Sequence, residues 1–114
     1  MKLLFVITKG LEKSGSAIRA MQFAALAAQQ GNQVEVFLID EAVHWARGIK
    51  AAYGESLNDY MEMLESRERP VRVCKPCAER RLISQDALIE GTVISPAPLL
   101  VKMMASPDYK VLCF

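Results

Sequence analysis

The chain has 114 residues, of which 52% are hydrophobic and 24% are charged, and its formal net charge is +1. This length fits a single domain spanning residues 1–114, with one hydrophobic core, and is too short for two domains. The near-neutral charge argues against a nucleic-acid-binding protein, and no apolar run approaches the roughly 20 residues that a membrane span needs.

The first two predicted strands flank a long helix. The run KLLFVIT at residues 2–8 is continuously apolar, and because no small-residue cleavage site follows it, we interpret it as a buried strand rather than a secretion signal. We expect Ser14 or Ser16 to cap a helix that ends at Gly31, a C-cap glycine. The sequence QVEVFLI at residues 33–39 is typical of a second strand.

The middle of the chain is less regular. Residues 41–55 are interrupted by two glycines and predict no regular element. Ser56, followed three residues later by Asp59, forms a capping-box pattern that predicts a helix ending before Pro70. The apolar face of this helix consists of Leu57, Tyr60, Met61 and Leu64.

The last third of the chain predicts three more strands. They are the runs VRVC at 71–74, TVIS at 92–95 and YKVLCF at 109–114, with a helix at 97–105 and a short helix capped by Ser84 and ending at Glu90. Strands that alternate with helices favour a parallel sheet covered by helices on both faces. We therefore expect an α/β domain with a mostly parallel sheet of about five strands.

The expected functional edge of such a domain lies at the carboxyl ends of its strands, where ligand chemistry gathers. In this chain those ends are residues 8–10, Asp40, Cys74 and residues 95–98. The motif CKPC, which runs from Cys74 to Cys77, is thus predicted to lie on this edge.

The two cysteines of the motif are candidates for nucleophilic chemistry. Cys74 would end a strand and Cys77 would lie near the start of the next helix, where backbone N–H groups favour a thiolate and lower the pKa of a thiol below about 8.5. Arg80 and Arg81 would add positive charge nearby. The pattern therefore predicts Cys74 as the nucleophile.

Other uses of the cysteines also fit the sequence. The pair resembles a thioredoxin-type dithiol that can cycle to a disulfide. Structural zinc is disfavoured because it needs four ligands, and the remaining soft donors, Cys113 and His44, have no partner at ligand spacing. We expect Cys113, in an apolar strand, to be a buried core thiol, and His44 to be a surface or pocket residue.

Two further features bear on the class of protein. The loop GLEKSGS is spaced like a phosphate-binding loop, but Ser16 occupies the position of the required lysine, which argues against nucleotide hydrolysis. The odd number of cysteines argues against a disulfide framework, so we expect a protein of the reducing cytoplasm.

Taken with these elements, the sequence resembles the DsrE/DsrF-like family of small sulfur-relay proteins. The resemblance is carried by the stretches SAIRAMQFAALAAQQGNQVEVFLID, VRVCKPCAERRLI, LIEGTVIS and LLVKMMASPDYKVLCF. It implies a Rossmann-like fold, assembly into homotrimers or homohexamers, and no metal or cofactor. The sequence departs from the usual pattern at Leu82, where relatives often have glycine.

The resemblance also implies a function. Some members of the family accept sulfur as a persulfide on a cysteine placed like Cys74 and pass it between a donor and an acceptor protein, and others carry a second cysteine placed like Cys77. Cys77 would then resolve the persulfide or hold the sulfur, and Arg80 or Arg81 would stabilise the thiolate. The alternatives are a dithiol redox protein and a non-catalytic oligomeric binding module, for which Met63 is a candidate subunit contact.

Overall fold

The structure, a computed structural model, describes residues 1–64 and 69–114. Within these residues, five strands form one sheet in the order β4-β3-β2-β1-β5, and every pairing is parallel. The strands are β1 (Lys2–Ile7), β2 (Gln33–Leu38), β3 (Val71–Cys74), β4 (Thr92–Ser95) and β5 (Tyr109–Cys113). The predicted parallel five-stranded sheet is therefore confirmed.

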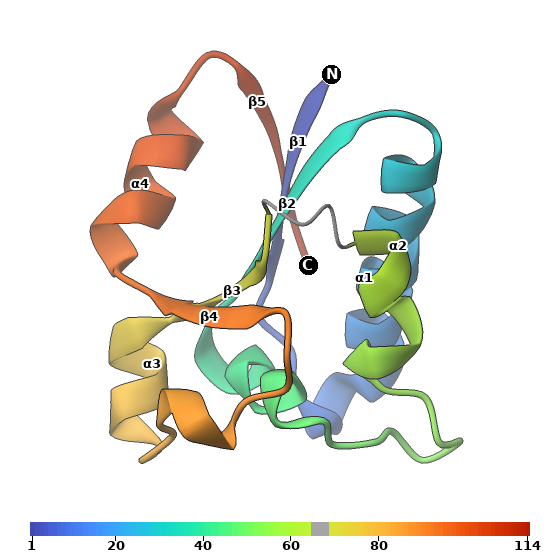
Figure 1. Ribbon diagram of the computed structural model, residues 1–114, viewed down its shortest axis with the longest axis vertical. Helices are drawn as coiled ribbons and strands as arrows, with labels where there is room; N and C mark the ends of the chain where they lie inside the picture. Colours follow the sequence, from blue (N-terminus) through green and yellow to red (C-terminus); the bar gives the residue numbers. More distant parts are fainter. Residues whose placement is uncertain (65–68) are drawn as a thin grey trace.

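Helices cover both faces of the sheet. The α-helices are α1 (Ser14–Gln29), α2 (Met61–Leu64), α3 (Lys75–Arg80) and α4 (Ala97–Ala105), and the 3-10 helices are η1 (Leu11–Lys13), η2 (Asp40–Arg47), η3 (Leu57–Tyr60) and η4 (Gln85–Ala87). Figure 1 shows α1 and α2 on one side of the sheet and α4 on the other, with α3 near the carboxyl ends of the strands. This three-layer arrangement confirms the predicted α/β fold.

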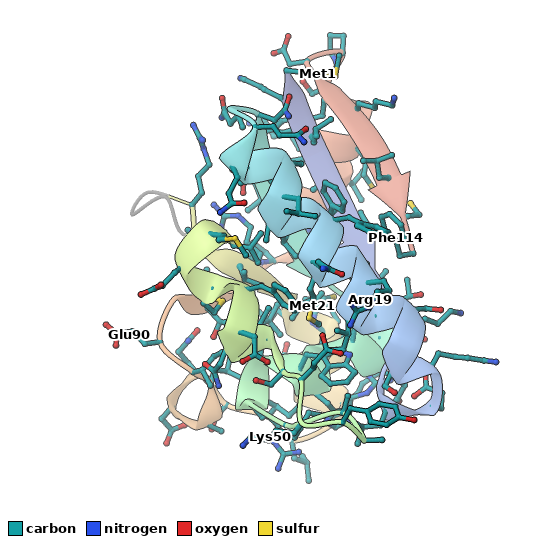
Figure 2. The ribbon with its side chains drawn as sticks, turned by 90° about the vertical axis from the view of Figure 1, so that its right-hand side faces the viewer. Met1, Arg19, Met21, Lys50, Glu90 and Phe114 are labelled. Carbon is teal, nitrogen blue, oxygen red and sulfur yellow. The ribbon has the colours of Figure 1, made fainter. Side chains whose placement is uncertain are left out.

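The core is built mainly on the strands that have neighbours on both sides. The side chains of Leu4, Ile7 and Phe37 are fully buried, which explains the continuous apolar runs in β1 and β2. Figure 2 shows α1 and α2 side by side over one face of the sheet, with Met21 of α1 directed inward, and Met21 has no exposed surface. The end of α1 is set by Gly31, whose positive φ of 89° suits glycine.

The predicted capping box forms, although it opens a 3-10 helix. Asp59 accepts a hydrogen bond from the backbone N–H of Ser56 at 2.8 Å, and the Ser56 side chain completes the box at the start of η3. The predicted apolar face is buried: Leu57, Tyr60, Met61 and Leu64. Met63 is half-buried and packs against the core. The helix was expected to continue to the residues before Pro70. Of these, residues 65–68 lie outside the described part of the chain.

The predicted serine cap of α1 is wrong, whereas Ser84 takes its predicted cap position without a side-chain cap bond. The chain enters α1 through the 3-10 turn η1, so Ser14 is already the first helical residue and Lys13, with no side-chain cap bond, precedes it. Ser16 therefore lies inside the first turn. Ser84 makes no cap bond either, and the helix expected from there to Glu90 is only the short turn η4, because the chain is already extended at Leu88.

The segment after β2, for which no element was predicted, is part of the core. It forms η2, in which Val43 and Trp45 have no exposed surface, and the indole N–H of Trp45 donates to the carbonyl of Lys9 at 2.8 Å. Gly48 ends η2 with a φ of 79°. The apolar side chains of η2 are buried, so this helix packs firmly at the carboxyl edge of the sheet. The buried residues are Ala42, Val43, Trp45 and Ala46.

Cys113 is exposed, and its expected burial as a core thiol is wrong. It belongs to β5, which pairs only with β1 and is an edge strand, so apolar character in this strand does not imply cover on both faces. Phe114 next to it is better packed, with its ring stacked on Phe5 at a centroid distance of 5.6 Å. Among residues 1–64 and 69–114, no helix has the length and apolar character that a membrane span requires.

Candidate active site

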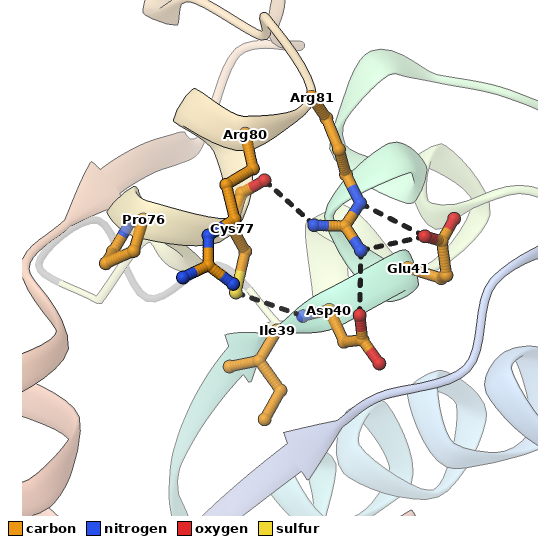
Figure 3. A pocket seen from close by; sticks show the side chains of 7 residues that line it. All are labelled: Ile39, Asp40, Glu41, Pro76, Cys77, Arg80 and Arg81. Atoms are coloured by element: carbon orange, nitrogen blue, oxygen red, sulfur yellow. Dashed lines mark hydrogen bonds and ion pairs between the residues drawn. The ribbon is translucent and has the colours of Figure 1, made fainter.

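A surface pocket of about 520 Å³ lies where β2 and β3 end. The turn from β2 into η2 forms one wall and α3 forms the other (Figure 3). The lining residues are Ile39, Asp40, Glu41, Pro76, Cys77, Arg80 and Arg81. The prediction that Asp40 and the CKPC motif meet at the carboxyl edge of the sheet is therefore confirmed.

Cys77 is the cysteine that lines this pocket. It lies in the first turn of α3, and its side chain is half-buried. The backbone N–H of Asp40 donates a hydrogen bond to the Cys77 sulfur at an N–S distance of 3.2 Å (Figure 3). An N–H donor interacts more strongly with an anionic sulfur than with a neutral thiol, and the anionic form is the one that attacks electrophiles.

Cys74 has a different environment. It is the last residue of β3 and the cap residue of α3, and its surface is only 6% exposed. Burial, followed by the hydrogen bond with the Cys77 side chain, raises the pKa of the Cys74 thiol to about 11. The backbone N–H of Cys77 and the charge of Arg80 act in the opposite direction and are outweighed. Cys74, which the sequence predicted as the nucleophile, is therefore a buried thiol with a raised pKa.

Arg81 connects the two walls of the pocket. Its guanidinium donates to the carboxylate of Asp40 at 2.7 Å, to that of Glu41 at 2.7 and 3.2 Å, and to the carbonyl of Cys77 at 3.0 Å. Because these acceptors occupy its N–H groups, Arg81 acts on the cysteine through the surrounding backbone. Arg80 is exposed and lines the same pocket, so it is the better placed of the two arginines to attract an anion.

Other residues of the predicted edge have structural roles. The hydroxyl of Thr8 donates to the carbonyl of Phe114 at 2.8 Å and helps fix the end of β5. Ser95 is buried next to Cys74 in the sheet register, and its hydroxyl accepts a hydrogen bond from Arg72 at 3.2 Å. None of these residues lines the pocket of Cys77.

The two remaining soft donors lie apart from the CKPC motif. His44 lines a smaller pocket of about 280 Å³, with its Nε2 3.5 Å from the Glu41 carboxylate, as expected for a pocket residue. Cys113 is on the edge strand. Across the described parts of the chain, no group of three or more His, Cys, Asp or Glu side chains is arranged to hold a metal ion.

Glu41 and the backbone of Asp40 are the site features that sequence reasoning missed. Asp40 was recognised only as a strand end, and its role depends on a backbone conformation that has no sequence signature. The sequence did hold a weak indication of the role of Glu41. An acidic residue directly after one strand end lies within reach of a basic residue that follows the helix of the neighbouring strand.

Comparison with known proteins places this site in a family. The sequence model of the DsrE/DsrF-like family matches residues 1–114. The chain belongs to the DsrE/DsrF-like family. Its relatives in this family include the protein YchN of Escherichia coli K12, which is 33% identical over 116 aligned positions that cover 99% of this chain and 98% of YchN. The protein MJ0989 of Methanocaldococcus jannaschii is 28% identical, with coverage of 95% and 96%.

Solved structures agree with this membership. The crystal structure of YchN from E. coli superposes with a TM-score of 0.83 at 31% identity, covering 100% of this chain and 99% of that one. BT1422 from Bacteroides thetaiotaomicron superposes with a TM-score of 0.71 at 11% identity, covering 99% and 94%, which shows a shared fold.

The departure from the DsrE/DsrF-like pattern at Leu82 has a structural meaning. Leu82 follows α3 with a positive φ of 55°, and its side chain is 94% exposed. The N–H of the next residue, Ile83, donates to the carbonyl of Ala78 at 2.9 Å, which closes the helix as in a Schellman motif. This position favours glycine, and leucine adopts the same turn here at an energetic cost.

Proposed function

We propose that this protein is a persulfide carrier of an intracellular sulfur relay and that Cys77 is the residue that accepts the sulfur. The observation that carries the proposal is the contrast between the two thiols of the CKPC motif. Cys77 lines a pocket and receives a hydrogen bond from a backbone N–H, whereas Cys74 is buried and has a raised pKa. The proposal keeps the sulfur chemistry expected from the sequence and moves the nucleophile from Cys74 to Cys77.

The transfer needs neither a metal nor a redox cofactor. The Cys77 thiolate attacks the outer sulfur of a donor persulfide, so that a new S–S bond forms on Cys77 while the donor's S–S bond breaks. The electron pair of the broken bond leaves with the donor, which becomes a thiolate. An acceptor thiolate then attacks the outer sulfur on Cys77 by the same exchange, and Cys77 is regenerated as a thiolate.

Cys74 has a second role in this scheme. It ends β3, and Cys77 lies three residues later in the first turn of α3, so the two thiols belong to one strand–helix turn. If the Cys74 thiol attacks the inner sulfur of the Cys77 persulfide, a Cys74–Cys77 disulfide forms and hydrogen sulfide leaves with the proton of Cys74 and that of the persulfide. Burial and the raised pKa of Cys74 slow this step, which protects the carried sulfur until an acceptor arrives.

The proposal includes partners and an assembly. Sulfur donor and acceptor proteins would approach the pocket from the surface, and the thiols would stay reduced in the cytoplasm. A homotrimer or homohexamer, as the family resemblance implies, would cover apolar side chains that the single chain exposes. The exposed apolar side chains of the two long helices are Phe23, Leu26, Val101 and Met104. Met63, which packs on the core, is a poorer candidate for a subunit contact.

Intact-protein mass spectrometry tests the proposal. The protein is incubated with a cysteine desulfurase and free cysteine, beside Cys74→Ser, Cys77→Ser and Cys113→Ser variants. We expect wild type to gain sulfur that a reductant removes, and we expect this gain to be lost in Cys77→Ser and kept in the other two variants. Loss of the gain only in Cys74→Ser would return the nucleophile to Cys74.

A dithiol redox protein is the second candidate, favoured by the CKPC spacing, which places Cys74 at the end of β3 and Cys77 in the first turn of α3. In that case the same experiment gives no added sulfur, whereas oxidised glutathione, which accepts two electrons and two protons to give two thiols, removes two hydrogens from wild type but not from Cys74→Ser or Cys77→Ser. An unchanged mass in every sample would favour the third reading, a non-catalytic oligomeric binding module.

A further inference from the structure

Asp40 has an unusual backbone conformation at the pocket. Its φ is 51°, in the left-handed region, and among the described residues other than glycine only Leu82 shares this feature. The left-handed region is disfavoured for residues with a Cβ atom, although aspartate tolerates it better than most. Such conformations persist where the surrounding structure holds them, and they cluster at functional sites.

The conformation of Asp40 gives its N–H an unusual partner. This N–H donates to the sulfur of Cys77, 37 positions away in the chain, at an N–S distance of 3.2 Å. The preceding N–H, that of Ile39, still donates to the carbonyl of Ile7 at 3.0 Å, as in a regular sheet. The chain therefore leaves the sheet ladder at Asp40, where the backbone donor turns to the sulfur.

Arg81 holds both partners of this hydrogen bond. One nitrogen of its guanidinium lies 2.7 Å from the Asp40 carboxylate, and another lies 3.0 Å from the carbonyl of Cys77 (Figure 3). The Glu41 carboxylate, at 2.7 Å, fixes the guanidinium from the side. The Arg81 side chain is 20% exposed and that of Asp40 is 68% exposed, so solvent reaches this ion pair from the Asp40 side.

We propose that Asp40 and Arg81 are positioning residues for Cys77: Arg81 holds Asp40 in the left-handed conformation, and the N–H of Asp40 then donates to the Cys77 sulfur and holds it at the pocket. An N–H donor stabilises an anionic sulfur more strongly than a neutral thiol. The carboxylate of Asp40 serves to anchor the backbone, while the backbone N–H acts on the sulfur.

The charges around the sulfur make this assignment specific. The charged groups that line the pocket are Asp40 and Glu41 from η2 and Arg80 and Arg81 from the α3 segment, and the Cys74 thiol lies behind Cys77. The two carboxylates by themselves would oppose a thiolate. Because Arg81 binds both of them, the N–H of Asp40 can act on the sulfur without an uncompensated negative charge beside it.

Two substitutions at Asp40 separate the backbone from the carboxylate. Asp40→Gly and Asp40→Ala both remove the carboxylate, but glycine adopts a positive φ freely and alanine does not. The measurement is the rate of Cys77 alkylation by iodoacetamide across a pH series, followed by mass spectrometry of the Cys77 peptide. We expect Asp40→Ala to be slower than Asp40→Gly at neutral pH by about fivefold, with its pH profile moved to higher pH.

Leu82 provides a matched control, because it has the same left-handed backbone and does not line the pocket. Leu82→Gly and Leu82→Ala differ by the same conformational preference, and we expect them to leave Cys77 alkylation equal. Equal alkylation rates in Asp40→Gly and Asp40→Ala, with both variants folded by circular dichroism, would overturn the proposal. A difference of the same size at Leu82 would overturn it too, since the effect would then be general.

A second pair of variants tests the anchor without changing Asp40. Arg81→Gln removes the bond to both carboxylates, and Arg81→Lys keeps a charge but loses the forked geometry. We expect both to slow Cys77 alkylation at neutral pH, Arg81→Gln by about tenfold and Arg81→Lys by less. Wild-type rates in Arg81→Gln would overturn the role of the anchor.

The use of this arrangement in sulfur transfer rests on the proposed function, but alkylation does not depend on it. If wild type fails to acquire sulfur from a desulfurase while the Asp40→Ala and Asp40→Gly rates differ, the proposed function fails and the positioning role stands. If sulfur is acquired and the two Asp40 variants react alike, the positioning role fails and the proposed function stands.

Discussion

Cys74 and Cys77 share one short motif, yet Cys77 lines the pocket where β2 and β3 end, while Cys74 does not line that pocket and is 6% exposed. The difference arises because β3 ends at Cys74 inside the sheet layer, and the chain needs one turn of α3 to bring the next thiol to the surface. The two thiols thus lie at different depths, and burial raises the pKa of the deeper one, Cys74. This order determines which of them meets an incoming electrophile first.

The first prediction concerns the relative reactivity of the thiols. With a pKa of about 11, only about one Cys74 in 10⁴ is a thiolate at pH 7, and burial restricts access further. We expect iodoacetamide to alkylate Cys74 in the folded protein at least about 100-fold more slowly than the exposed Cys113. Peptide mapping over time measures both rates, and unfolding in guanidinium should make them similar. Equal rates in the folded protein would contradict the burial of Cys74.

The second prediction concerns stability at alkaline pH. The pKa of Cys74 in the folded state is about 11, above its ordinary value of 9.0. Between these values the unfolded chain loses the proton and the folded chain keeps it, so the free energy of unfolding falls as pH rises from 9 to 11. We expect Cys74 to account for a loss of about 2 kcal/mol over this window and for none below it.

Urea unfolding of wild type and Cys74→Ala at several pH values measures this contribution. Burial also raises the pKa of Tyr60 and of Tyr109, so these tyrosines contribute to the pH dependence of stability. Their contribution is the same in wild type and in Cys74→Ala. The difference between the two curves therefore isolates Cys74. If the two proteins lose stability in parallel above pH 9, the raised pKa of Cys74 is contradicted.

Sequence reasoning predicted the fold well because the relevant signals are local and repeated. The apolar runs of β1 and β2, and the glycine that ends α1, follow from burial on both faces and from the positive φ at Gly31. The failures have one cause, which is tertiary context. Ser14 does not cap α1 because a 3-10 turn precedes it, and Cys113 is exposed because β5 has only one neighbour.

The site was predicted in part for the same reason. The position of CKPC at the carboxyl edge follows from the alternation of strands and helices. Which cysteine reaches the pocket depends on where β3 ends relative to the sheet layer, and the role of Asp40 depends on its φ of 51°. Neither quantity has a sequence signature in a single chain.

The third prediction concerns Leu82. This residue has a φ of 55° with 94% of its surface exposed, so its side chain contributes little packing to offset the unfavourable backbone. We expect Leu82→Gly to increase the free energy of unfolding by about 0.5–1 kcal/mol, and Leu82→Pro to be strongly destabilising because proline fixes φ near −65°. Urea unfolding measures both. A destabilised Leu82→Gly would indicate that the leucine side chain packs against something, such as a second subunit.

The fourth prediction concerns Gln85, which covers the free edge of β4. Its side-chain amide donates to the carbonyl of Thr92 at 3.0 Å and accepts from the N–H of Ile94 at 2.8 Å, so one side chain takes the place of a neighbouring strand. Exposed strand edges pair readily with other chains, and such cover reduces that tendency.

Gln85→Ala should therefore expose two backbone groups of β4 at once. We expect a loss of about 1–2 kcal/mol in the free energy of unfolding and faster hydrogen exchange at the N–H of Ile94. Asp86→Ala is the matched control, because Asp86 lies in the same turn and its side chain accepts a hydrogen bond from the Ser84 hydroxyl rather than binding the backbone of β4. Faster exchange at Ile94 in both variants would show that the η4 turn as a whole, rather than the Gln85 amide, protects this edge. Faster exchange in Gln85→Ala alone would establish that a single side chain replaces the missing strand, and self-association of that variant at high concentration would then follow from its uncovered edge.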